Sequence, residues 1–131
     1  FLRPHTEEVM HILHKMHEVV IITARNEKDL PLNSNRNMEE ITKTWLKDNN
    51  INYDHLVFSE IDKTQVILDY KIDLMIEDNP IFLLDAAESN VKLLCFDASY
   101  NNYLQHPNII HICSWYDLLY NICNWSRKDD I

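Results

Sequence analysis

Two adjacent carboxylates, Glu77 and Asp78, are the feature of this chain with the clearest chemistry. They follow the apolar run Leu74-Met75-Ile76, which is typical of a buried strand. If the turn after that strand directs both side chains into one cleft, their charges repel each other unless a divalent cation lies between them. Because oxygen-only ligation suits Mg²⁺, we predict a magnesium site here. The structural alternative is an Asp that caps the next helix, beside a solvated Glu.

Three more side chains have the chemistry to bind a phosphate group. Thr23 ends a β-branched run, and its hydroxyl can donate to a phosphate oxygen or, in the structural alternative, to a backbone carbonyl. Lys63 begins an expected helix, where a cation opposes the helix dipole; the alternative is an exposed surface lysine. Arg25 is a further candidate for substrate binding, with an exposed salt-bridging arginine as the alternative. The order Thr23, Lys63, Glu77-Asp78 carries more information than any of these residues alone.

The elements that must position these residues alternate between strand and helix. Apolar runs predict strands at residues 19–23, 55–58, 73–76, 91–96 and 109–112. Amphipathic patterns predict helices after a cap at residue 6, around 38–46, over 63–70, over 80–88 and after a cap at residue 114. This alternation predicts an α/β fold with a mostly parallel sheet covered by helices on both faces. In such folds ligands bind at the carboxyl ends of the strands.

Local signals predict how several helices begin and which faces they bury. Thr6 is expected to cap the first helix. The buried face of that helix is predicted to hold Val9, Ile12, Leu13 and Met16. Asn79 followed by proline predicts a capped helix start, and Ser114-x-x-Asp117 is a capping box. Residues 26–37 are polar and predict a mobile loop beside the site.

Composition limits the classes of protein to which the chain can belong. Its 131 residues, 46% of them hydrophobic, fit one domain over residues 1–131. It has no glycine, which excludes both a glycine-rich dinucleotide turn and a glycine-rich phosphate loop. A formal net charge of −9 opposes non-specific binding to nucleic acid, so we expect no nucleic-acid polymer as a partner.

Three further sequence features bear on where the protein works. Its 3 cysteines form no C-x-x-C pair, which indicates reduced thiols and predicts a cytoplasmic protein. No apolar run approaches the roughly 20 residues of a membrane span, so we expect no membrane partner. Because the first residue is Phe rather than Met, the sequence is expected to begin inside a longer gene product.

The order of these residues resembles that of the haloacid dehalogenase (HAD) superfamily of phosphohydrolases. Three of the four family motifs match, namely an apolar strand ending in Thr23, a helix-start Lys63 and an apolar strand ending in Glu77-Asp78. The segments HEVVIITAR, TKTWLKDNNINYDHLVF, DKTQVILDYKIDLMIEDNP and FDASYNNY are similar to the 5'-nucleotidase-like HAD proteins related to the 5'(3')-deoxyribonucleotidases. The resemblance covers nearly the whole chain and implies a HAD-like Rossmannoid three-layer fold.

The chain departs from the family pattern at the first motif, a strand ending in Asp-x-Asp that supplies the nucleophile and the general acid/base. No Asp-x-Asp follows an apolar strand here. We therefore interpret residues 1–131 as a partial HAD-like core domain without the N-terminal strand and the cap. In the family the first-motif strand is central, between the Thr strand and the paired-acid strand. Its absence is expected to leave two strand edges open, which costs stability.

The resemblance also implies a mechanism, in which an aspartyl-phosphate forms with Mg²⁺ as cofactor. The expected substrate is a nucleotide or another small phosphomonoester. Thr23 and Lys63 are implied to be catalytic, by donating to a phosphate oxygen and by balancing its charge. Asp78 is implied to bind the metal, with Glu77 binding it directly or through water. Thr23, Lys63 and Arg25 make up the expected substrate-binding set.

Two other function classes compete with this hypothesis. A receiver-like phospho-acceptor domain uses similar residue types, but it places its acid pair first and its lysine last, whereas here Lys63 precedes Glu77-Asp78. A non-catalytic HAD-like remnant that binds a ligand or a partner fits the missing nucleophile. The residues that precede Phe1 in the gene distinguish this remnant from an enzyme.

Overall fold

The computed structural model describes residues 3–24, 37–59 and 63–129. The chain is a mixed α/β protein in which every strand pairing is parallel within these ranges. It divides into two compact units, an amino-terminal unit (Thr6–Ile61) and a carboxy-terminal unit (Asp62–Ile131 together with Phe1–His5). The single partial domain expected over residues 1–131 stays a prediction. None of the helices in the described ranges is long and apolar enough to cross a lipid bilayer.

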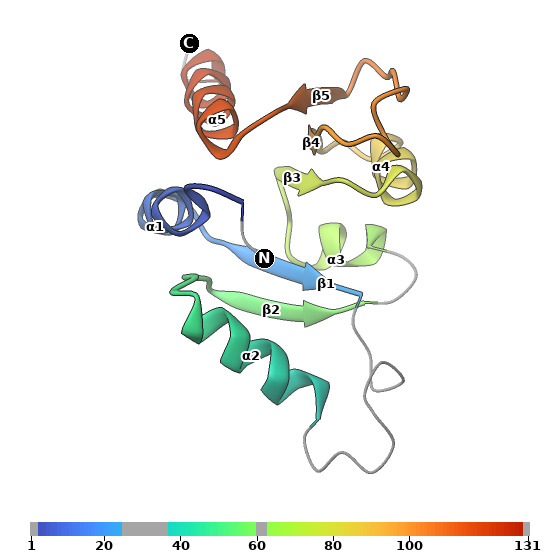
Figure 1. Ribbon diagram of the computed structural model, residues 1–131. Coiled ribbons are helices and arrows are strands. Elements are labelled where there is room, and N and C mark those ends of the chain that lie inside the picture. The colour runs from blue at the N-terminus through green and yellow to red at the C-terminus, as the bar shows by residue number, and fades with distance from the viewer. Residues whose placement is uncertain (1–2, 25–36, 60–62, 130–131) are drawn as a thin grey trace. The chain divides into compact units, whose positions relative to one another are not determined.

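In its described residues, 6–24 and 37–59, the amino-terminal unit has two helices and two strands. Along the chain these are α1 (Thr6–Met16), β1 (Val20–Thr23), α2 (Met38–Asp48) and β2 (His55–Phe58). The two strands lie side by side and point the same way in Figure 1, with Val20 opposite His55 and Thr23 opposite Phe58. All four residues of β1 are half-buried in the unit as described.

The first helix buries a different stripe from the predicted one. Its buried residues are Thr6, Val9, Met10 and Leu13, which follow the i, i+3, i+4, i+7 spacing of a single helical face. Ile12 and Met16 are 37% and 63% exposed. Each residue turns a helix by about 100°, so these two side chains lie at the margin of the stripe. Thr6 is the first residue of the helix rather than the cap before it.

The part of the carboxy-terminal unit that the structure describes contains the other three strands and three helices. These are α3 (Thr64–Asp69), β3 (Leu74–Glu77), α4 (Pro80–Ala87), β4 (Lys92–Phe96), β5 (Ile109–Ile112) and α5 (Trp115–Asp129). The parallel sheet has the order β3-β4-β5, with Glu77 opposite Cys95 and Cys95 opposite His111. Because both pairings are parallel, all three strands end along one edge of the sheet.

The core of this unit lies around β4. Leu83 on α4 and both Leu93 and Cys95 on β4 are completely buried. The rest of the cluster comes from α3, β3, α4, β5 and the adjoining loops: Ile67, Met75, Ala86, Ala87, Val91, Leu104 and Ile109. Burying one leucine of this kind stabilises a fold by about 1.5–3 kcal/mol, so this cluster holds the strand ends in place.

Two of the predicted helix starts are confirmed by their hydrogen bonds. The side chain of Asn79 accepts from the amides of Ile81 and Phe82, at the start of α4. The hydroxyl of Ser114 accepts from the amide of Asp117, at the start of α5. These caps satisfy amide groups that have no partner within their own helix. The turn between β3 and α4 is thereby fixed directly after the paired acids.

The strands that carry Thr23 and Glu77, β1 and β3, each lie at the edge of their own sheet. Within the described ranges, β1 pairs with β2 and β3 pairs with β4, and no strand pairing links the two sheets. The strand that carries Thr23 and the strand that carries Glu77 are therefore both edge strands. An unpaired edge exposes backbone amide and carbonyl groups that another strand can bind.

Candidate functional site

A buried ion pair lies at the carboxyl end of β3. The Nζ of Lys63 is 2.7 Å from Oε2 of Glu77, and the two side chains are only 9% and 11% exposed. The same Nζ lies 4.4 Å from the centre of the Phe82 ring. Lys63 occupies the position just before α3, and its side chain makes no capping bond to that helix. The alternative of an exposed surface lysine is therefore wrong.

The burial of Lys63 has a clear electrostatic requirement. Removing an ammonium from water is costly unless a carboxylate and further polar or aromatic groups replace the lost hydration. Here the carboxylate of Glu77 supplies the opposite charge, and the Phe82 ring adds a cation–π contact. The sequence signal, a lysine at the disfavoured end of a helix, is explained by this partner on β3.

Glu77 uses its second oxygen to hold the turn after β3. Its Oε1 accepts from the amides of Asp78 and Asn79, at 3.1 and 3.2 Å. Both carboxylate oxygens of Glu77 are therefore engaged, one by an ammonium and the other by two amides. A cation that bound Glu77 directly would compete with all three donors. The contacts of Glu77 suit a residue that positions Lys63 and the turn.

Asp78 makes different contacts from its neighbour. Its side chain is half-buried, and its Oδ2 accepts from the phenol of Tyr100. The cap of α4 is Asn79, not Asp78, and Glu77 is largely buried, so the alternative of a capping Asp beside a solvated Glu is wrong. Within the carboxy-terminal unit, Asp78 is therefore the acid of this pair whose carboxylate is not committed to a buried cation.

The segment after β4 completes this edge of the sheet. Asn101 is completely buried and donates to the carbonyl oxygens of Asp78 and Phe96, at 2.8 and 2.9 Å. Its Oδ1 accepts from the amide of Ala98 at 2.9 Å. Asn101 thus links the ends of β3 and β4. Sequence reasoning missed both Tyr100 and Asn101, because no local pattern shows that the Tyr100 phenol reaches Asp78 or that Asn101 is buried.

The electrostatic potential of this edge is negative. Burial, together with the nearby carboxylates of Asp97, Asp78 and Glu77, raises the pKa of the Cys95 thiol to about 11. The hydrogen bond to Asp78 raises the pKa of the Tyr100 phenol, which therefore stays protonated as a donor. A negative potential favours the binding of a cation here.

His111 forms a second polar link at the same edge. Its Nδ1 is 2.5 Å from Oδ1 of Asp97, and its Nε2 is 2.7 Å from the carbonyl oxygen of Leu104. Because both neighbours are acceptors, the imidazolium form satisfies both. The backbone hydrogen bond to Leu104, followed by the contact with Asp97, raises the pKa of His111.

The other predicted site residues belong to the amino-terminal unit or lie outside the described ranges. Thr23 ends β1 and is half-buried, and its carbonyl oxygen accepts from the amide of Ser59 at 2.9 Å. Arg25 lies outside the described residues, as does most of the loop predicted over residues 26–37. The structure brings together Lys63, Glu77 and Asp78.

The donor set at Asp78 fits a magnesium ion in one respect. Mg²⁺ is commonly held by one or two carboxylates, with waters and substrate phosphate oxygens completing its shell. Asp78 supplies one such carboxylate in a negative potential, and Glu77 is engaged elsewhere. Among the residues in the described ranges, no group of three or more His, Cys, Asp or Glu could enclose a metal ion.

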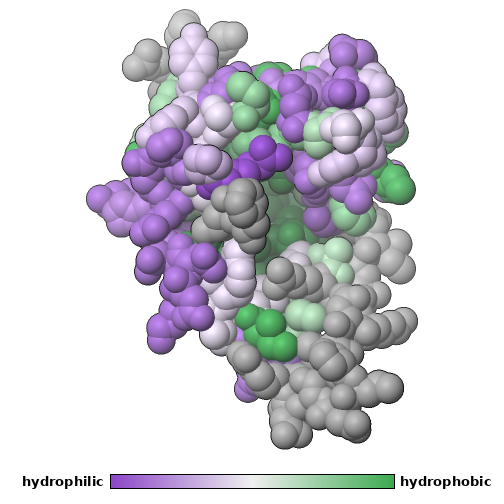
Figure 2. All heavy atoms as spheres, viewed as in Figure 1, coloured by the Kyte–Doolittle hydropathy of each residue, from purple (hydrophilic) through white to green (hydrophobic). Residues whose placement is uncertain are grey.

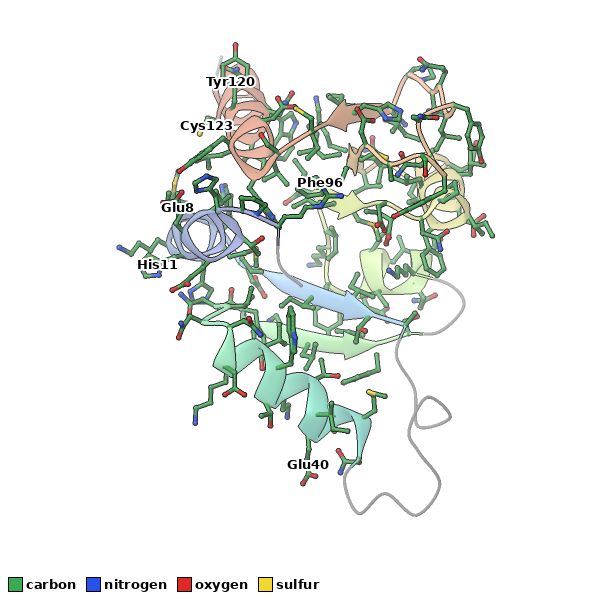
Figure 3. The ribbon with its side chains drawn as sticks, viewed as in Figure 1. Glu8, His11, Glu40, Phe96, Tyr120 and Cys123 are labelled. Atoms are coloured by element: carbon green, nitrogen blue, oxygen red, sulfur yellow. The ribbon has the colours of Figure 1, made fainter. Side chains whose placement is uncertain are left out.

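Two histidines of α1 contact the segment that precedes β2. His11 points outward from α1 in Figure 3, and its Nδ1 lies 2.9 Å from the side-chain nitrogen Nδ2 of Asn52. The Nε2 of His14 lies 3.2 Å from Oδ1 of Asp54. The other carboxylate oxygen of Asp54, Oδ2, accepts from the backbone amide of Val19. These contacts link α1 to the segment before β2.

The chain is similar to several proteins named as putative nucleotidases. It is 27% identical to YqfW of Bacillus subtilis over 116 residues, which are 87% of this chain and 55% of that protein. It is 25% identical over 124 residues to a relative from Halalkalibacterium halodurans, covering 93% and 59% of the two chains. It is 29% identical over 119 residues to one from Oceanobacillus iheyensis, covering 88% and 57%.

This similarity has a defined extent. The chain spans less than two thirds of the length of each of these relatives. No protein-family model matches the chain. No solved structure matches it.

Proposed function

We propose that this chain is part of a Mg²⁺-dependent phosphohydrolase of the HAD type that acts on a nucleotide or another small phosphomonoester. The observation that carries the proposal is the buried Lys63–Glu77 pair beside Asp78, at the carboxyl ends of parallel strands. A fixed ammonium next to an available carboxylate is suited to a phosphate group and its counter-cation. The similarity to proteins named nucleotidases supports a nucleotide as the substrate class.

In this proposal the two acids have different roles. Asp78 holds Mg²⁺, which when bound supplies charge neutralisation at the phosphate oxygens. Glu77 is a positioning residue, since it fixes the ammonium of Lys63 and the amides of Asp78 and Asn79. Its carboxylate also lies directly beside the Lys63 side chain, in a place that is largely closed to water.

The phosphate is bound by groups that donate hydrogen bonds. An ammonium has three N–H donors, so Lys63 retains donors for phosphate oxygens after it binds Glu77. Thr23 donates its hydroxyl to another phosphate oxygen, and Arg25 binds the substrate. The roles of Thr23 and Arg25 rest on the resemblance to the HAD motifs.

The nucleophile is an aspartate on a strand outside this sequence. Its carboxylate attacks phosphorus to form an aspartyl-phosphate and expel the alcohol, and water then hydrolyses the acyl phosphate. The resemblance to the HAD family implies that this strand is central, between the Thr strand and the paired-acid strand. The edge positions of β1 and β3 in their sheets support such an addition.

A non-catalytic remnant that binds a ligand or a partner is the second candidate. The observation in its favour is that no Asp-x-Asp follows an apolar strand in the sequence. The same pocket chemistry would then bind a phosphorylated ligand without turnover. Activity of the natural gene product separates the two candidates.

The test is phosphate release from a panel of nucleoside monophosphates by the natural gene product, with Mg²⁺ and with EDTA. We expect turnover that EDTA abolishes. Asp78→Asn removes one anionic oxygen and is expected to lower turnover by about 100-fold or more. The control is Asp85→Asn, which changes an exposed acid on α4 of the same unit and is expected to retain activity. EDTA-insensitive turnover, or full activity of Asp78→Asn, contradicts the proposal.

A further inference from the structure

The segment between β4 and β5 contains two residues that the proposed mechanism does not use, Tyr100 and Asn101. Side chains over this segment form a mainly hydrophilic surface in Figure 2. Tyr100 is 52% exposed, yet its phenol donates to Oδ2 of Asp78. A half-exposed side chain therefore occupies an oxygen of the acid to which the cation site is assigned.

Asn101 fixes the backbone from which Tyr100 extends. Its three hydrogen bonds join it to Asp78, Phe96 and Ala98, and it has no exposed surface. Breaking this arrangement would remove three hydrogen bonds in a buried place, which is costly. The backbone beside Tyr100 is therefore held firmly to the ends of β3 and β4.

The far end of the same short segment is also held. Leu104 is buried, its amide donates to the carbonyl oxygen of Asn101, and its own carbonyl oxygen lies 2.7 Å from His111. With both ends anchored, movement at Tyr100 needs only a change in the side-chain torsion angles. Rotation of a half-exposed tyrosine into solvent requires no rearrangement of the core.

We propose that Tyr100 gates the cation site: its phenol occupies one carboxylate oxygen of Asp78 until a divalent cation takes that oxygen and the phenol turns into solvent. This inference rests on the proposed function, because it assumes that Asp78 binds the cation. The phenol and the cation compete for the same lone pairs. Because the phenol is neutral, it occupies the carboxylate without cancelling the negative charge that attracts the cation.

The gate makes a prediction for affinity that differs from that of a merely structural residue. Tyr100→Phe removes the competing donor and keeps the ring, so Mg²⁺ is expected to bind about two- to tenfold more tightly. A tyrosine that only supported the site would give weaker binding when altered. The matched control is Tyr103→Phe, which changes an exposed tyrosine on the same segment and is expected to leave the affinity unchanged.

The experiment is a calorimetric titration of the natural gene product with MgCl₂, for the wild type and for Tyr100→Phe, Tyr103→Phe and Asp78→Asn. A second readout is the tyrosine ultraviolet difference spectrum on addition of Mg²⁺. We expect a signal in the wild type and in Tyr103→Phe, because in both proteins Mg²⁺ separates the Tyr100 phenol from the Asp78 carboxylate. We expect a smaller signal in Tyr100→Phe, which has no phenol at this position.

The outcomes separate the gate from the proposed function. Equal or weaker binding of Mg²⁺ by Tyr100→Phe overturns the gate and leaves Asp78 as the metal ligand. Unchanged binding of Mg²⁺ by Asp78→Asn, or no binding by any of the four proteins, would show that Asp78 does not bind the cation. Either result overturns the gate and the metal-dependent part of the proposed function. Tighter binding by Tyr100→Phe alone supports the gate.

Discussion

Removing one partner of the Lys63–Glu77 pair should destabilise the fold far more than removing an exposed charge. Lys63→Met leaves a largely buried carboxylate without its ammonium, and Glu77→Gln leaves the ammonium facing an amide. Loss of one partner of a buried ion pair typically costs about 3–5 kcal/mol. Glu77 keeps two backbone amides on its other oxygen, so we expect about 3 kcal/mol for Lys63→Met.

The double variant shows whether the two charges act on each other. Lys63→Met with Glu77→Gln removes both charges, so its loss should be smaller than the sum of the single losses. We expect a coupling free energy of at least about 2 kcal/mol from the four-protein cycle. The assay is urea unfolding followed by tryptophan fluorescence. The slope of the unfolding free energy against urea concentration should be the same for all four proteins.

The chain offers an exposed ion pair as a control. Lys43 and Glu39 on α2 lie 2.8 Å apart with side chains 54% and 59% exposed. Exposed pairs of this type contribute little to stability, so Lys43→Met with Glu39→Gln should show almost no coupling. Equal coupling in the two cycles would refute the reasoning, because burial would then not determine the strength of the Lys63–Glu77 interaction.

Three further predictions follow from other contacts. Cys113 and Cys123 are exposed and should react rapidly with a disulfide reagent at pH 8. Cys95 is buried and its pKa is raised to about 11, so it should react only when the protein unfolds. A spectrophotometric count of reactive thiols measures both. The pKa of His111 is raised in the folded protein, so its protonation stabilises the fold. This stabilisation is fully present below the ordinary pKa of histidine and is lost as the pH rises through the raised pKa of His111. Urea unfolding at several pH values should show the loss in the wild type and not in His111→Gln. Asn79→Ala removes the cap of α4 and should cost about 1 kcal/mol in urea unfolding, and Asn79→Asp should restore most of it.

Elements with strong local signals were predictable from the sequence. The β-branched and apolar runs correctly predict all five strands in the described ranges, with six of the ten strand boundaries identical and the other four different by one residue. The starts of α4 and α5 follow from the chemistry of Asn79 and Ser114, whose side chains bond to amides only a few residues away. The stripe of α1 was partly wrong, because the packing partners of Ile12 and Met16 are not encoded in that segment.

The site was predictable in its residue types but not in its contacts. Lys63 and Glu77 are 14 residues apart in sequence, and Asp78 and Asn101 are 23 apart, so their bonds depend on the completed sheet. A lysine that opposes the helix dipole was the available signal for Lys63. Nothing comparable marks Asn101, which is buried only because β3 and β4 end side by side.

The exposed tyrosines show the same limit. Tyr120 projects from α5 in Figure 3 and is 68% exposed, although tyrosine in an amphipathic helix is often buried at least in part. Phe96, at the end of β4, is covered instead: its ring lies 4.6 Å from the guanidinium carbon of Arg3 and 5.2 Å from the Trp115 ring. Partners so distant in sequence determine which aromatic residues are buried.

The most direct test of the account is to locate a divalent cation in crystals of the natural gene product. Crystals grown with Mn²⁺ in place of Mg²⁺ allow the ion to be identified by anomalous diffraction. The account predicts an anomalous peak about 2.1 Å from a carboxylate oxygen of Asp78, with Lys63 still paired to Glu77 and the Tyr100 phenol displaced from Asp78. A cation bound elsewhere, with Asp78 still bonded to Tyr100, would contradict it.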